Sequence, residues 1–201
     1  MGNTDKFDMI ASVYDTADRV EIARVSSDAI REVLIEAKNK EAIDFGCGTG
    51  LVGMNLLDEF KSVLFLDTSP NMIQQINQKI SNLNIKNATT LCFDFEKSNL
   101  SELRTDYLFM AQVLLHIENY RGVLSKLYHV LNPGGHLIII DFIKNDEVRS
   151  DMVHNGFQLD KLTREMAGMG FVDIHSKVFY TGSKIFMGQD ASMFILDSRK
   201  G

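Results

Sequence analysis

The sequence predicts an α/β fold built on a mostly parallel, doubly wound β-sheet. Short apolar stretches alternate with stretches of helical periodicity from residue 16 to residue 142, and strands separated by helices form right-handed parallel units. Two further strand-like stretches near the C-terminus have no helix between them, so they can pair only as an antiparallel hairpin. A glycine-rich segment, 46–50, joins the first strand directly to a helix. Parallel α/β sheets bind their ligands at such strand ends.

Length and composition indicate an ordinary globular domain. The chain has 201 residues, of which 45% are hydrophobic and 24% are charged, close to the average for globular proteins. We expect a single domain over residues 1–201. Its parts would be an N-terminal lid and helix at 1–38, a ligand-binding core at 42–142, and a substrate loop, helix and terminal hairpin at 143–201.

Charge and hydropathy exclude several partner classes. The net charge is −6 and the basic residues are scattered, which argues against nucleic acid as the main partner. The longest apolar runs, such as Leu137–Ile140, are too short to cross a membrane, and Met1–Asp8 is too polar for a secretory signal. We therefore expect a cytoplasmic protein. Cys47 and Cys92 cannot make a disulfide framework or a cysteine-rich metal site, and no bound metal is expected.

The first half of the chain predicts three strands and three helices. Residues 16–38 carry apolar side chains at helical spacing. A helix beginning at Ser69-Pro70 is expected because Ser is a favoured N-cap and Pro is tolerated at the first helical position. The remaining elements are strands at 42–45, 62–66 and 88–93, with Asp67 ending the second, and a helix at 51–60.

The second half predicts a central buried strand and a C-terminal hairpin. The stretch 107–114 is almost wholly apolar, as expected for a strand covered on both faces. Asn132–Gly135 should end a helix and turn the chain. A loop of roughly ten residues should join the last two strands. The expected elements are helices at 119–131 and 158–169, strands at 136–142, 171–180 and 192–196, and an irregular polar stretch at 144–157.

The glycine-rich segment admits two interpretations. Gly48, Gly50 and Gly53 match the G-x-G-x-x-G pattern of dinucleotide sites, with Asp67 at the distance of a ribose-binding acid. In the other interpretation, Gly46, Gly48 and Gly50 form a G-x-G-x-G loop.

Register favours the second interpretation. The turn begins at Gly46, directly after the apolar strand, and the dinucleotide pattern counted from there would need glycine where the chain has Leu51. An acid at Asp44, two residues before the loop, suits a ligand with an ammonium or sulfonium charge better than a pyrophosphate.

At these residues the chain resembles the class I S-adenosylmethionine-dependent methyltransferases. The resemblance covers roughly residues 7–200 and rests on several segments in the family's order. The segments are Asp44–Leu51, Asp67, Phe93-Asp94-Phe95, Leu114–Ile117 and Leu131–Leu137. Phe7-Asp8, Ala11 and Tyr14-Asp15 are similar to the small-molecule branch that includes quinone-biosynthesis methyltransferases. The family's fold is a three-layer, Rossmann-like sandwich with a seven-stranded sheet of order 3-2-1-4-5-7-6 and strand 7 antiparallel.

The resemblance implies S-adenosylmethionine as the methyl donor and assigns roles to strand-end residues. Asp67 would bind both ribose hydroxyls, and Asp94 would accept from the adenine amine. Apart from the resemblance, residues 7–15 are too apolar for a free tail, so we expect residues 1–15 to close the crevice above the glycine loop as a lid, with Tyr14 reaching the methionine end. The alternative is that this segment only covers the helix at 16–38. A capping role for Asp44, a turn role for Asp67 and Asp94, and core packing for Met72 remain open alternatives. The donor-binding residues expected are Tyr14, Asp44, Gly46, Cys47, Gly48, Gly50, Asp67, Thr68, Met72, Asp94, Phe95 and Ala111.

Methyl transfer by in-line displacement needs orientation more than covalent chemistry. A general base matters only if the acceptor must lose a proton. His116, after the fourth strand, is the best candidate for that base, and His154 is a candidate for binding the acceptor. Each could instead be a structural loop histidine. His129, His136 and His175 are expected to be structural or solvated.

The sequence narrows the acceptor without naming it. Ala111–Leu114 lacks the proline-containing tetrad of amino-nucleobase methyltransferases, and neither cysteine follows a proline, as C5-cytosine enzymes require. Asp141 alone is too little for a metal-dependent catechol site. A small-molecule acceptor is expected, methylated on O, N, S or C, with a protein side chain left open. Two rivals are a non-catalytic module that binds S-adenosylmethionine and an NAD-dependent oxidoreductase. The protein would be a monomer or a homodimer.

Overall fold

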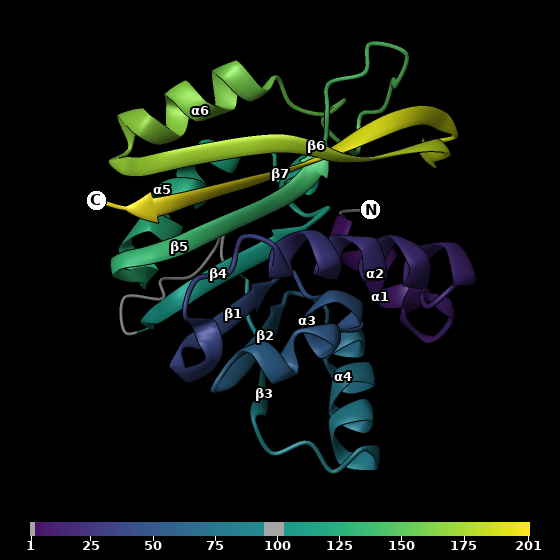
Figure 1. Ribbon diagram of the computed structural model, residues 1–201. Helices are drawn as coiled ribbons and strands as arrows, with labels where there is room; N and C mark the ends of the chain where they lie inside the picture. Colours follow the sequence, from purple (N-terminus) through teal and green to yellow (C-terminus); the bar gives the residue numbers. More distant parts are fainter. Residues whose placement is uncertain (1–2, 95–102) are drawn as a thin grey trace. The chain divides into compact units, whose positions relative to one another are not determined.

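The computed structural model describes residues 3–94 and 103–201, in two compact units formed by residues 1–100 and 101–201 (Figure 1). Each unit is described by itself, and a single domain remains a prediction. The strands are β1 (Glu41–Phe45), β2 (Ser62–Asp67), β3 (Ala88–Cys92), β4 (Thr105–Ala111), β5 (Leu131–Phe142), β6 (Phe171–Phe186) and β7 (Gln189–Lys200). Their order is β3-β2-β1-β4-β5-β7-β6, with β7 antiparallel, which confirms the expected sheet.

In the first unit, β1 pairs in parallel with β2, and β2 pairs in parallel with β3. The helices between these strands are α3 (Leu51–Asn55) and α4 (Pro70–Asn82). Both crossovers step in the same direction across the sheet, so right-handed connections place both helices on one face. Helix α2 (Ala17–Arg31) packs on α3, while α1 (Asn3–Ile10) and the 3-10 turn η1 (Ala11–Val13) pack against α4.

Side-chain caps begin α2 and α4, and the cap of α4 is the one that the sequence predicts. The Thr16 hydroxyl accepts a hydrogen bond from the Arg19 amide at 3.4 Å. The Ser69 hydroxyl accepts one from the Met72 amide at 3.1 Å, with Pro70 at the first helical position. Each cap satisfies an amide that the helix leaves without an internal partner.

Two helices end earlier than expected. The helix expected over 16–38 stops at Arg31, and the left-handed backbone at Glu36 (φ 49°) separates it from a 3-10 turn, η2 (Ala37–Asn39). The helix expected over 51–60 breaks at Leu56, which is followed by a second 3-10 turn, η3 (Leu57–Glu59). Apolar spacing predicts which residues face the core, but it does not distinguish a continuous helix from one broken into turns.

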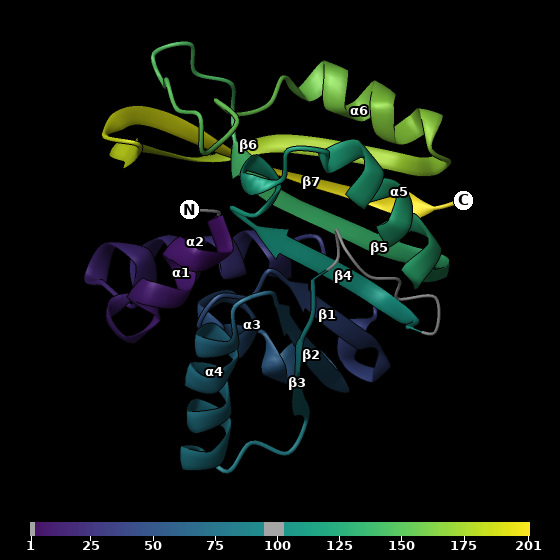
Figure 2. The ribbon, with the colours of Figure 1, turned by 180° about the vertical axis from the view of Figure 1, so that it is seen from behind.

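In the second unit, β4 and β5 pair in parallel and are joined through α5 (Tyr120–Val130). Figure 2 shows α5 on the near side of β5. The Asn119 side chain caps α5 by accepting a hydrogen bond from the Gly122 amide. Helix α6 (Leu159–Gly168) packs on β6. The strand expected at 107–114 ends at Ala111, and the chain then forms the 3-10 turn η4 (Leu114–His116).

Residues 132–135 form an irregularity within β5 instead of a turn before it. Thr105 pairs with Leu131 and Tyr107 pairs with His136, so the β5 side holds the extra residues. Gly134 has a φ of 72°, which glycine adopts readily. Glycine and proline therefore mark a bulge in the strand at this point.

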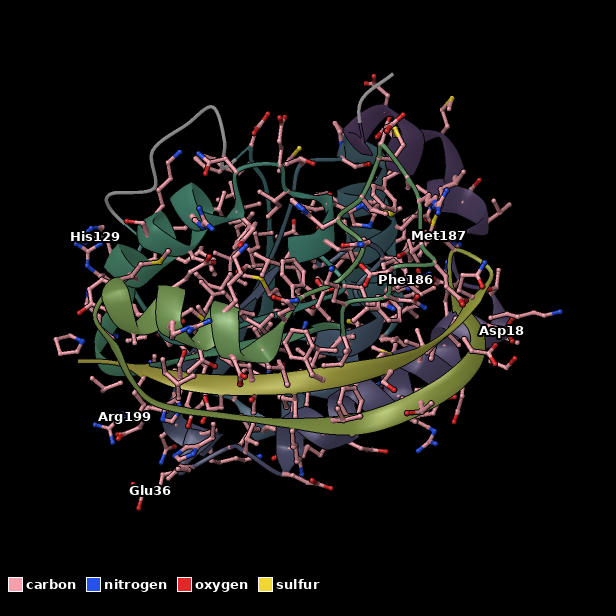
Figure 3. All side chains as sticks on the ribbon, turned by 90° about the horizontal axis from the view of Figure 1, so that it is seen from above. Asp18, Glu36, His129, Phe186, Met187 and Arg199 are labelled. Atoms are coloured by element: carbon pink, nitrogen blue, oxygen red, sulfur yellow. The ribbon has the colours of Figure 1, made fainter. Side chains whose placement is uncertain are left out.

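The C-terminal hairpin is longer and tighter than expected. Instead of short strands and a loop of about ten residues, β6 and β7 continue to a two-residue turn at Met187-Gly188 (Figure 3). Both turn residues have positive φ, 51° and 79°, as a type I′ hairpin turn requires. Most of β6 is exposed, so its sequence lacks the apolar alternation that marks a half-buried strand.

The long helices do not include a membrane span. Over residues 3–94 and 103–201, no helix has the length together with the hydrophobicity needed to cross a bilayer.

A buried carboxyl group orders the chain after β4. Asp141 in β5 is fully buried and accepts hydrogen bonds from the Leu115 amide at 3.0 Å and the Phe142 amide at 2.8 Å. Burial raises the pKa of Asp141 to about 7, although these hydrogen bonds oppose the shift. The folded protein therefore holds a proton here that the unfolded chain releases at lower pH.

This pKa predicts how stability depends on pH. Between pH of about 4 and about 7 the folded protein binds more protons than the unfolded chain, so Asp141 lowers the free energy of unfolding as pH rises. Asp141→Asn removes this titration. Its unfolding free energy relative to wild type should rise across that window by up to ~1.4 kcal/mol per pH unit. Urea unfolding at several pH values measures the difference. The exposed Asp58→Asn is the control, and a pH-independent difference for Asp141→Asn would contradict the prediction.

Gly53 predicts a packing effect. A Cβ added there would overlap the Asp44 carboxylate and lie 2.6 Å from the Phe65 ring. Gly53→Ala should therefore lower the free energy of unfolding by about 1–3 kcal/mol. Gly168→Ala in α6 is the matched control, because no described residue outside the neighbouring backbone of that helix lies within 4 Å of its added Cβ. Urea unfolding measures both variants, and equal stabilities would refute the tight packing at Gly53.

Candidate functional site

The glycine loop after β1 turns at the three positions that the sequence favoured. Gly46, Gly48 and Gly50 have φ values of 67°, 54° and 81°, a region that residues with a Cβ rarely adopt. The Gly46 and Cys47 amides donate to the Leu66 carbonyl at 2.7 and 3.1 Å. The loop is thereby fixed to the end of β2.

Gly53 has a different role from these three. It lies inside α3, and the Gly53 amide donates to the Asp44 carboxylate at 3.1 Å. The absence of a Cβ lets α3 approach the sheet closely. The alternative pattern through Gly53 thus contains a packing glycine, whereas the turns of the loop follow the Gly46-Gly48-Gly50 register.

Asp67 stands at the end of β2 beside this loop. One carboxylate oxygen accepts from the Gly48 amide at 2.8 Å, and the other accepts from the Ser69 amide at 2.9 Å. Burial raises the pKa of Asp67, although these hydrogen bonds oppose the shift. A carboxylate can accept about four hydrogen bonds. The Thr68 amide also donates to this carboxylate, so Asp67 keeps acceptor capacity for a ligand hydroxyl.

The surroundings of Gly48 fit a ligand that lies along the loop. Among the described residues other than its two chain neighbours, one atom lies within 4 Å of a Cβ added at Gly48, namely Cε1 of Tyr14 at 3.8 Å. The loop therefore has space over Gly48, and the Asp67 acceptors lie next to it. These features suit the ribose and methionine portion of S-adenosylmethionine.

Asp44 lies beneath the loop. Its side chain is 3% exposed and bonds to the Gly53 amide. Burial raises the pKa of Asp44 to about 8, and the charge of Asp67 adds to the shift. Asp44 is therefore mostly neutral near pH 7. This geometry supports the capping alternative, and a contact with the donor remains a prediction.

The other expected donor residues differ in their surroundings. Cys47 is half-buried, and burial raises the pKa of its thiol, which stays uncharged. Met72 is 1% exposed and lies in the core, as its packing alternative stated. Thr68 and Asp94 are half-buried at the ends of β2 and β3. Phe95 lies outside the described residues.

The N-terminal segment is attached to the start of α4 through Asp8. The Asp8 carboxylate accepts from the Ser69 hydroxyl at 2.7 Å, from the Asn71 amide at 3.0 Å and from the Asn71 side chain at 2.8 Å. The side chain of Asn71 also donates to the Asp8 carbonyl at 3.1 Å. Four hydrogen bonds therefore hold α1 at this helix end.

A second attachment lies at Asp15. Its carboxylate accepts from the Thr49 hydroxyl and from the Lys79 ammonium, the latter at 2.7 Å. Lys79 also donates to the Thr49 carbonyl at 2.8 Å. Asp15 thus connects the segment to the glycine loop and to α4. Thr49 and Lys79 were not among the expected site residues, because their partners are 34 and 64 residues away in the chain.

Tyr14 lies between these attachments. Its ring faces Gly48, and the Arg19 guanidinium lies 4.2 Å from the ring centre. Burial raises the pKa of Tyr14, so its hydroxyl remains a donor. The segment therefore contacts the glycine loop through Tyr14 and Asp15, and its role as a lid remains a prediction.

In the second unit, His154 is bound to the turn that carries His116. The His154 amide donates to the Leu115 carbonyl at 2.8 Å, and its Nε2 donates to the Ile117 carbonyl at 2.9 Å. Donation from Nε2 leaves Nδ1 as the acceptor of a neutral ring. His116 and Ala111 are half-buried, and Ala111 ends β4.

The three histidines expected to be structural or solvated are found in such places. His136 is buried and bonds to Asp197 at 2.9 Å while stacking on Tyr107. His129 and His175 are exposed, and Figure 3 shows the His129 ring at the edge of the molecule.

The comparisons with known proteins agree with this geometry. Residues 43–137 match a family described as "Methyltransferase domain". An uncharacterised methyltransferase of Schizosaccharomyces pombe is 29% identical over 129 residues, which are 61% of this chain and 44% of that protein. A sterol 4-C-methyltransferase of Caenorhabditis elegans is 28% identical over 123 residues, 61% of this chain and 37% of that protein. The chain thus spans less than half the length of these two relatives.

The structural comparison extends over nearly the whole chain. The DhpI–SAH complex has a TM-score of 0.76 with 17% sequence identity, covering 98% of this chain and 95% of that one. At this identity the similarity concerns the fold. Sheet order, family match and fold together support the assignment of the chain to the class I S-adenosylmethionine-dependent methyltransferases.

Proposed function

We propose that the chain transfers a methyl group from S-adenosylmethionine to a small molecule. The observation that carries the proposal is the Asp67 carboxylate beside the open glycine loop. Its remaining acceptor capacity would be directed at the ribose hydroxyls. Gly46, Gly48 and Gly50 would allow the donor to approach the backbone.

The donor supplies an activated methyl group, so the protein's task is mainly to hold the reactants in line. Orientation of this kind is worth about 7–11 kcal/mol in favourable cases. The segment carrying Tyr14 would exclude water from the donor, since Asp8 and Asp15 hold it against α4 and the glycine loop. Exclusion of water strengthens the electrostatic contacts inside a site.

The roles of the histidines depend on the acceptor. His116 would serve as general base for an acceptor that loses a proton, and an acceptor that is already nucleophilic would need none. His154 would contact the acceptor, with Nδ1 available as a hydrogen-bond acceptor while Nε2 holds Ile117. The relatives named as methyltransferases act on a sterol, on malonyl-[acyl-carrier protein] and on demethylmenaquinone. Because these acceptors differ in their chemistry, none of them is assigned to this chain.

Turnover distinguishes this function from a non-catalytic module. A panel of nucleophilic small molecules, incubated with the chain and isotopically labelled S-adenosylmethionine, should yield one labelled product. Donor binding without label transfer to any member would favour the binding module, and binding of NAD in place of the donor would favour the oxidoreductase.

Asp67→Ala tests the donor site. It should weaken binding of S-adenosylhomocysteine at least tenfold, because charge-assisted hydrogen bonds contribute about 1.5–3 kcal/mol each. Isothermal titration calorimetry measures the affinity, and thermal unfolding shows whether the variant is folded. Asp58→Ala, an exposed aspartate of the same unit, is the matched control. Unchanged affinity in a folded Asp67→Ala would remove Asp67 from the site.

Limited proteolysis tests the N-terminal segment. Saturating S-adenosylhomocysteine should slow cleavage within residues 1–15 at least tenfold, since a ligand that binds the closed form lowers the population of the open form. Asp8→Ala combined with Asp15→Ala should speed cleavage in the free protein by removing both attachments, whereas Asp58→Ala should not. An equal rate with and without ligand would leave the segment as packing, and Tyr14 would lose its assignment.

A further inference from the structure

A cavity of about 430 Å³ lies within the second unit, and its lining includes His154, the candidate for binding the acceptor. Its walls come from the first residues of α5, from the irregular segment after β5 and from the first residues of α6. The volume falls in the range of small-molecule sites, about 300–1,000 Å³. The cavity can therefore hold a metabolite-sized ligand.

The charged groups around this cavity are mainly positive. Arg121, Lys144 and Lys161 line it, against one acid, Glu118. The chain as a whole carries a net charge of −6, so the local excess of positive charge is opposite in sign to that of the molecule. This arrangement favours an anionic ligand.

Two helices begin at the same cavity. Asn119 and Gln158, which line it, are the N-caps of α5 and α6. The Asn119 side chain caps its own helix, whereas Gln158 makes no side-chain cap hydrogen bond. Helix N-termini carry partial positive charge and present amide donors. Their polarity therefore adds to that of the three basic side chains.

The basic side chains of the cavity make contacts within the protein that leave some of their N–H donors for a ligand. Glu165 accepts from the Tyr120 hydroxyl at 2.8 Å and pairs with one nitrogen of Arg121. A guanidinium has five N–H donors, so Arg121 keeps others for a ligand. Lys144 pairs with Asp146, whose side chain is 80% exposed, and such exposed pairs are weak and exchangeable.

Aromatic rings complete the cavity. Tyr120 packs edge-to-face on His154 and Phe157, with ring centres 5.5 and 5.4 Å apart. All three residues line the cavity. Apolar ring surface beside convergent polar groups is the usual composition of a metabolite site.

From these observations we propose that the cavity binds the methyl acceptor through a carboxylate or phosphate group, held by Arg121, Lys144 and Lys161. This inference rests on the proposed function, which it deepens by naming the class of acceptor: a small organic anion. The aromatic rings would contact its carbon skeleton.

Binding of model anions to the full chain tests the inference. The probes are phenyl phosphate and phenylacetate, with benzyl alcohol as the neutral counterpart. Titrations followed by two-dimensional NMR should show saturable binding of either or both anions, with shifts confined to amides of residues 118–121, 144 and 154–162. Benzyl alcohol should bind at least tenfold more weakly than the tighter anion. Which anion binds separates a phosphate-bearing from a carboxylate-bearing acceptor.

Charge variants locate the binding. Lys144→Gln combined with Lys161→Gln should weaken binding of the tighter anion at least tenfold. Lys126→Gln, an exposed lysine of α5 that does not line the cavity, removes a charge of the same type and should change the affinity less than twofold. S-adenosylhomocysteine affinity, measured on the same samples, should stay unchanged in all variants.

Several results would overturn the inference. The first is that neither anion binds at about 10 mM, a concentration above the Kd of most specific sites. The second is that benzyl alcohol binds as tightly as the anions. The third is that the double variant binds the tighter anion with unchanged affinity. If S-adenosylhomocysteine still binds in such a case, the proposed function stands and only the acceptor class is wrong. If the wild-type chain does not bind S-adenosylhomocysteine at all, that result would instead contradict the proposed function.

Discussion

The Asp67 carboxylate is the interaction on which the donor side of the structure depends. Its two oxygens accept amide hydrogen bonds from Gly48 in the glycine loop and from Ser69 at the start of α4. One side chain thereby fixes the loop after β1 relative to the helix after β2. Ser69 in turn caps α4 and donates to Asp8, so the position of the N-terminal segment follows from the same carboxylate.

The features that sequence reasoning captured are local. Strand–helix alternation predicts the sheet, and Ser69-Pro70 predicts the start of α4, because these signals lie within a few residues of their effect. The glycine register could also be settled from the sequence, since a turn must begin where the apolar strand ends. The capping alternative for Asp44 and the packing alternative for Met72 could not be resolved that way, because burial depends on neighbours from other elements.

The features that sequence reasoning missed are long-range or lack hydrophobic contrast. Lys79 is half-buried on α4, and only the folded chain brings it to Asp15. Arg121, Lys144 and Lys161 are scattered in the sequence, and the cavity alone brings them together. The length of the C-terminal hairpin was missed for lack of hydrophobic contrast, because its outer strand, β6, is too exposed to show apolar alternation.

That outer strand has a consequence for how the protein behaves at high concentration. β6 ends the strand order and would offer backbone groups to another copy of the sheet. Its pairing with β7 shifts register three times, and Asp173 and Lys184 take positive φ at two of the shifts. Such bulges, together with exposed charges, bend an edge and prevent a regular ladder from extending across it. The irregular hairpin thus protects the sheet against edge-to-edge aggregation.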